Sequence, residues 1–100
     1  MDYNKYPVAH PQVASRTVDG SAIVVLADSG LVKMFNPVGT RVWELADGTQ
    51  SVREIVSGIM QEFDVDQTQA EQDVIEFLQQ LIDTQALTLQ DEPNAIKKNS

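Results

Sequence analysis

The chain has 100 residues, of which 42% are hydrophobic, and this composition fits one folded domain with a single small core. The formal net charge is −8, and residues 66–92 hold seven acidic residues but no lysine or arginine, so this half would repel a nucleic-acid backbone. No cysteine is present, which excludes disulfides and cysteine-based metal or redox sites.

Both ends of the chain predict flexible segments around one domain. Residues 1–11 contain two prolines and no periodic apolar pattern, so we expect a loose N-terminal arm. This start lacks the apolar core of a signal peptide, and the longest apolar run, residues 22–27, is too short to span a bilayer. We therefore expect a cytoplasmic protein without membrane contact, with a folded domain over residues 12–89 and a flexible tail over residues 90–100.

Between this arm and the middle of the chain, the pattern predicts a three-stranded antiparallel meander. Asp19 and Gly20 supply the φ > 0 positions of a tight hairpin turn, and a second turn follows at residues 28–30. The last strand is expected at an edge of the sheet, where its backbone donors and acceptors have no partner. The three strands are expected at residues 12–18, 22–27 and 31–35.

Asn36 and Pro37 mark the change from sheet to helix. Asparagine is a favoured N-cap, and proline suits the first helical position because no amide donor is needed there. A helix is therefore predicted over residues 37–46, and Trp43 is expected to pack in the core.

Two further helices are predicted by their caps and their apolar spacing. Ser51 and Glu54 form a capping box that begins the second helix, and Asp66 can cap the third. Ile75 and Ile82 lie beside the core stripe of the third helix, on a flank that a minimal core does not require. The core stripe of that helix comprises Ala70, Val74, Phe77, Leu78 and Leu81.

Strands followed by three helices predict an α+β domain with a winged-helix-like shape, in which residues 86–89 form a brief strand or a capping extension. The residue types argue against catalysis, because His10 is the only histidine and the glycines are isolated. A calcium-loop pattern starts at Asp64 but fails, since Gln69 and Ile75 replace the required glycine and glutamate. We expect no enzymatic activity, no metal and no cofactor.

The sequence resembles the PqqD-like family. The resemblance covers about residues 12–89, and Phe35 stands where the family usually has leucine. The residues that carry it are FNPVGTRVWEL at 35–45, DG at 47–48, SVREIV at 51–56, DVIEFLQQL at 73–81 and AL at 86–87.

This resemblance implies a RiPP recognition element, a non-catalytic domain that binds the leader segment of a ribosomally made precursor peptide and presents it to a modifying enzyme. It also implies that the leader adds as a further strand along the third strand, in a groove with the third helix. The strand edge is then formed by Leu31, Val32, Lys33, Met34 and Phe35. Ile75, Leu78 and Ile82 are expected to form the apolar wall, while Glu71 and Lys33 set the peptide register by charge.

Several alternatives stay open at this stage. The modifying enzyme could be a radical SAM protein of pyrroloquinoline quinone synthesis or an enzyme of another peptide pathway. A structural or regulatory domain could bind a folded partner through the same edge, whereas a winged-helix DNA binder is opposed by the acidic third helix. We expect a monomer or weak dimer, and the sequence leaves open which face of the third strand lines the groove.

Overall fold

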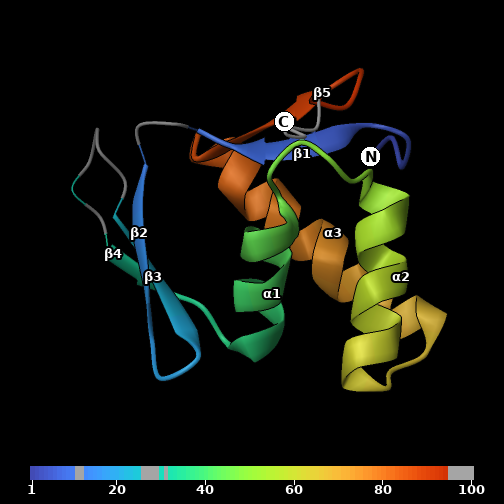
Figure 1. Ribbon diagram of the computed structural model, residues 1–100, viewed down its shortest axis with the longest axis horizontal. Helices are drawn as coiled ribbons and strands as arrows, with labels where there is room; N and C mark the ends of the chain where they lie inside the picture. Colours follow the sequence, from blue (N-terminus) through green and yellow to red (C-terminus); the bar gives the residue numbers. More distant parts are fainter. Residues whose placement is uncertain (11–12, 26–29, 31, 95–100) are drawn as a thin grey trace, which may run out of the picture.

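The computed structural model describes residues 1–10, 13–25, 30 and 32–94 (Figure 1). In this part of the chain, no helix is long and apolar enough to cross a membrane. The elements in chain order are β1 (Tyr6–Ala9), β2 (Ala14–Val18), β3 (Ser21–Val25), β4 (Val32–Met34), α1 (Pro37–Leu45), α2 (Val52–Phe63), α3 (Gln67–Asp83) and β5 (Leu87–Gln90).

Strands β2, β3 and β4 form the predicted antiparallel meander, with β3 in the centre. The register pairs Thr17 with Ala22 across the first turn and Val24 with Lys33 across the second. Asp19 and Gly20 both have positive φ, as the tight turn requires. Since three helices follow this sheet, the predicted α+β class is confirmed. Gln12, Leu31 and residues 26–29, which belong to the predicted strands and second turn, lie outside the described residues.

A second sheet, which the sequence did not predict, joins β1 to β5 in antiparallel register. Here the expectation of a loose arm over residues 1–11 is wrong, because Tyr6–Ala9 is a strand and Pro7 is fully buried. Of the two alternatives for residues 86–89, a brief strand or a capping extension, the structure has the strand, which is β5. The expected tail at residues 90–100 is corrected at its start, since the Asn94 amide donates to the Gly48 carbonyl at 2.8 Å, whereas residues 95–100 lie outside the described residues.

All three predicted helix caps are present. The Asn36 side chain accepts from the Gly39 amide at 2.7 Å, with proline in the first turn of α1. Ser51 and Glu54 form a complete capping box at the start of α2. The Asp66 carboxylate accepts from the Gln69 amide at 2.8 Å and caps α3.

The core lies where the three helices meet the two sheets. In Figure 1, α1 lies between the β2–β3–β4 sheet and α2, α3 runs behind them, and β1 and β5 cross one end. Trp43 is in this core as predicted, with 9% of its surface exposed and an edge-on contact to Phe35. The largest fully buried side chains of the helices are Val42, Val52, Ile55, Ile59, Val74, Leu78 and Leu81.

Candidate functional site

Strand β4 is an edge of its sheet, because among the described residues it pairs with β3 alone. The Phe35 amide donates to the Ala22 carbonyl at 2.9 Å, so the backbone of Phe35, and of Lys33 two residues earlier, faces β3. The backbone groups of Val32 and Met34 therefore face away from β3. They form the free edge of the sheet.

The two faces of β4 have different surroundings. Val32 and Met34 are 61% and 72% exposed, whereas Lys33 is half-buried and Phe35 is buried. Alternate residues of a strand share a face, so the face with Lys33 and Phe35 is the one turned toward the helices. Lys33 and Phe35 of this face line the groove described next, together with Met34 from the opposite face.

A groove separates β4 from α3. Its first part is a cavity of about 350 Å³, and its second part is a cavity of about 240 Å³ toward α1. The two parts share Asn36, Phe77 and Gln80, so we treat them as one feature, the β4–α3 groove. The first part is further lined by Lys33, Met34, Phe35 and Leu81, and the second by Val38, Gly39, Asp73 and Glu76.

Two aromatic rings form the floor between these cavities. Phe35 and Phe77 meet edge to face, with ring centroids 4.6 Å apart and an interplanar angle of 83°. Gly39 allows this arrangement, since a Cβ atom at that position would lie 2.8 Å from Cε1 of Phe77. The first turn of α1 therefore fixes the ring that α3 contributes to the groove.

The structure divides the predicted site residues among three places. Val32, Lys33, Met34 and Phe35 lie at the edge or in the groove, as expected, while Leu31 lies outside the described residues. Leu78 is fully buried in the core, so its assignment to the groove wall is wrong. Glu71 and Ile75 line a cavity on the other flank of α3, and Ile82, seven positions after Ile75, shares that flank. The assignment of Ile75 and Ile82 to the apolar wall, and of Glu71 to the peptide register, is corrected as well.

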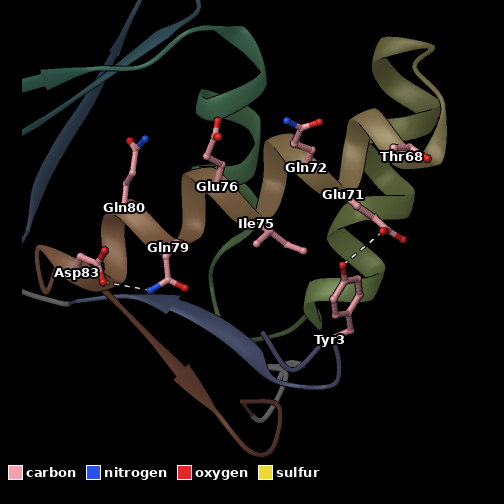
Figure 2. Close-up of a pocket in the computed structure, with 9 residues that line it drawn as sticks. All are labelled: Tyr3, Thr68, Glu71, Gln72, Ile75, Glu76, Gln79, Gln80 and Asp83. Atoms are coloured by element: carbon pink, nitrogen blue, oxygen red, sulfur yellow. Dashed lines mark hydrogen bonds between the residues drawn. The ribbon is translucent and has the colours of Figure 1, made fainter.

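Helix geometry explains this correction. Ile75 and Phe77 are two positions apart, so at 3.6 residues per turn they project about 160° from each other. In Figure 2, Ile75 and Gln79 point toward β1 and Tyr3, whereas Glu76 and Gln80 point the opposite way. The wall is formed by Phe77 and Gln80 instead, while the buried Leu81 borders the groove from the core side. The sequence signal for Phe77 was its place at the border of the core stripe, where an aromatic side chain can be partly exposed.

The second flank of α3 borders an open cavity of about 560 Å³, lined by residues that include Tyr3, Glu71 and Ile75 (Figure 2). This cavity shares Glu76 and Gln80 with the β4–α3 groove. The Tyr3 hydroxyl donates to Oε1 of Glu71 at 3.4 Å. Desolvation, followed by the negative charge of Glu71, raises the pKa of Tyr3 above the ordinary 10.0. Glu71 therefore serves a contact with the N-terminal segment, and it does not face β4.

The comparisons with known proteins bear on the same elements. The sequence matches the family model described as coenzyme PQQ synthesis protein D over residues 22–87. Among solved structures, a chain of TbiB1 in complex with the TbiA(beta) leader peptide is similar, with a TM-score of 0.73 and 28% sequence identity. This match covers 80% of the present chain and 93% of the other. A search of curated proteins found no match.

Proposed function

The chain belongs to the PqqD family, and we propose that it is a non-catalytic adaptor that binds the leader segment of a ribosomally synthesised precursor peptide. The observation that carries this proposal is the similar solved chain, which comes from a complex with a leader peptide and matches over nearly its whole length. The free edge of β4 and the groove beside it supply what such binding requires.

Binding proceeds by addition of the leader to β4 as a fourth strand of the sheet. The outward backbone groups of Val32 and Met34 exchange hydrogen bonds with the leader backbone, which gives affinity independent of sequence. Alternate leader side chains then point into the β4–α3 groove, where Phe77 and Gln80 contact them. These residues contact the leader in place of the apolar wall that the sequence predicted.

The adaptor then presents the bound leader to a peptide-modifying enzyme, such as a radical SAM protein of pyrroloquinoline quinone synthesis or of another peptide pathway. Strand addition leaves the rest of the precursor free, so the segment to be modified can reach a separate active site. We propose that the protein acts in the cytoplasm as a monomer or weak dimer. Its own role in this scheme is binding, without chemistry.

The experiment that tests strand addition compares two substitutions at one exposed position. Met34→Pro removes the outward amide of β4, and proline is tolerated on an edge strand. Met34→Ala is the matched control, because it shortens the side chain and keeps the amide. The probe is a leader peptide encoded beside the gene of this protein, and binding is measured by amide chemical-shift titration.

We expect chemical-shift changes in residues 32–35 and 77–81. We also expect a dissociation constant about tenfold higher for Met34→Pro than for Met34→Ala, because Met34→Pro loses one hydrogen bond worth about 1.4 kcal/mol. Equal affinities of the two variants would reject pairing through this amide. Shifts confined to Glu71 and Ile75, on the other flank of α3, would move the site there and keep the adaptor role. A leader that produces no shifts would contradict the proposed function itself.

A further inference from the structure

The β4–α3 groove carries opposite charges at its two ends. Lys33 lies in the part that Leu81 lines, near the C-terminal end of α3. Asp73 and Glu76 lie in the other part, beside the first turn of α1. Within the described part of the chain, neither Lys33 nor Glu76 forms a salt bridge, and the carboxylate of Asp73 accepts one hydrogen bond, from Gln69 at 2.9 Å. These charges are therefore available to a ligand.

The middle of the groove is apolar and lies between the charged ends. The rings of Phe35 and Phe77 form its floor, and both ends of the groove share Phe77. An apolar leader side chain placed here gains contact with an aromatic ring on α3, whereas a charged side chain would lose hydration without gaining a partner. The groove therefore presents three successive environments, which are cationic, apolar and anionic.

The direction of β4 relative to α3 orders these environments along a bound peptide. Going from Lys33 to Asn36, the chain moves from the part lined by Leu81 toward the part lined by Asp73, so β4 runs antiparallel to α3. Both existing pairings of this sheet are antiparallel, and antiparallel pairing is the more stable kind. A leader added antiparallel to β4 has its N-terminal end near Asp73 and its C-terminal end near Lys33.

The length of the groove determines how far apart along the leader the side chains lie that reach its three environments. Asp73 and Leu81 are eight positions apart in α3, which is about 12 Å at 1.5 Å per residue. Four steps of an extended strand span about 13 Å, and every second side chain of that strand points into the groove. The three environments thus correspond to positions i, i+2 and i+4 of a bound peptide.

From this geometry we propose that the groove selects leaders with a basic residue, an apolar residue and an acidic residue at positions i, i+2 and i+4 from the N-terminal side. The proposal rests on the proposed function and adds a rule for which leaders bind. The basic side chain contacts Asp73 and Glu76, the apolar one contacts Phe77, and the acidic one contacts Lys33.

The test uses two synthetic peptides of identical composition. One contains Lys-Thr-Leu-Thr-Glu and the other Glu-Thr-Leu-Thr-Lys, within the same flanking residues of high strand propensity. Affinity is measured by amide chemical-shift titration against the full chain. We expect the first peptide to bind about tenfold more tightly, because its two attractive contacts become repulsive in the second peptide. The preference should weaken as salt is added.

Charge-reversed variants test which residues of the groove cause the preference between the two peptides. The double variant Lys33→Glu with Glu76→Lys should invert the preference between the two peptides. Glu71→Lys, on the other flank of α3, is the matched control and should leave the preference unchanged. Equal affinities of the two peptides for the unmodified protein, or tighter binding of the second peptide, would overturn the proposed order of charges. Chemical-shift changes along β4 in the same titrations would still support strand addition.

Absence of shifts at β4 with both peptides would also overturn the selection rule. The natural leader titrated in the Met34 experiment then decides separately whether the proposed function holds. The failure of the rule and the failure of the function are thus distinguishable.

Discussion

The hydroxyl of Thr40 takes the place of a strand partner where β4 ends. The Phe35 amide makes the last ladder bond, to the Ala22 carbonyl, and the chain then turns into α1. The amide of Ala22 lies on the same side of β3 as its carbonyl. Because the chain turns into α1 after Phe35, this amide has no strand carbonyl as its acceptor, and it donates to Oγ1 of Thr40 at 2.8 Å. Both residues are buried, with 1% and 5% of their surfaces exposed. Replacement of this hydroxyl therefore tests how the sheet is joined to the helices.

Thr40→Val keeps the shape of the side chain and removes the acceptor. The buried amide of Ala22 is then left without a partner, which costs about 1–3 kcal/mol. The second bond of the hydroxyl, to the Phe35 carbonyl at 3.4 Å, is long and adds little. We expect the free energy of unfolding to fall by about 2 kcal/mol, a large share of the roughly 5–15 kcal/mol typical of a domain.

Urea denaturation followed by the fluorescence of Trp43, the single tryptophan, measures this change. We expect a lower midpoint at an unchanged m-value. Hydrogen exchange adds a local readout, because the Ala22 amide should lose more protection than the amides of α2. Thr40→Ser is the control, since it keeps the acceptor and should preserve the protection of Ala22. A Thr40→Val protein as stable as the wild type would refute the reasoning.

Three further outcomes are expected. Ser51→Ala removes the capping box of α2 and should lower the free energy of unfolding by about 1 kcal/mol in urea denaturation, whereas an unchanged value would mean that the cap is not needed. Leu87→Ala empties a fully buried site in β5 and should cost about 2–5 kcal/mol in the same assay, while a loss below about 1 kcal/mol would show that the β1–β5 sheet is peripheral. The pKa of Tyr3 is raised by desolvation and by Glu71, so the native state holds the phenolic proton more tightly and stability should fall as pH rises above 10.0. Glu71→Gln should lower that pKa in an absorbance titration, with Tyr3→Phe used to subtract Tyr6, and an unchanged pKa would exclude the contact.

Local signals carried most of the correct sequence predictions. Asn36 followed by Pro37, and the pairing of Ser51 with Glu54, depend on residues within one turn of each other, so the chain encodes them without reference to the rest of the fold. The turn at Asp19 is local in the same sense, because its side chain and the following glycine tolerate positive φ. The fold class follows from these signals together with apolar periodicity.

The predictions that failed depended on distant neighbours. Tyr6–Ala9 has no alternating pattern, and it is a strand because β5 offers a partner and Gly48 donates its amide to the Pro7 carbonyl at 2.9 Å. On α3, periodicity showed which residues share a stripe but not which neighbour lies along each flank. Periodicity alone therefore assigns Ile75 to β4, although Tyr3 occupies that side, and assigns Phe77 wholly to the core, although Phe77 lines the groove.

The pairing of β1 with β5 also has a consequence for the order in which the molecule folds. Its register joins Tyr6 to Gln90, so the contact closes a loop that contains most of the chain. The entropy cost of closing a loop grows with its length, whereas the meander and the helix caps join residues close in sequence. We expect those local units and the helix core to assemble first and the β1–β5 sheet to close late. Mutations in β1 should then speed unfolding and leave the rate of folding nearly unchanged.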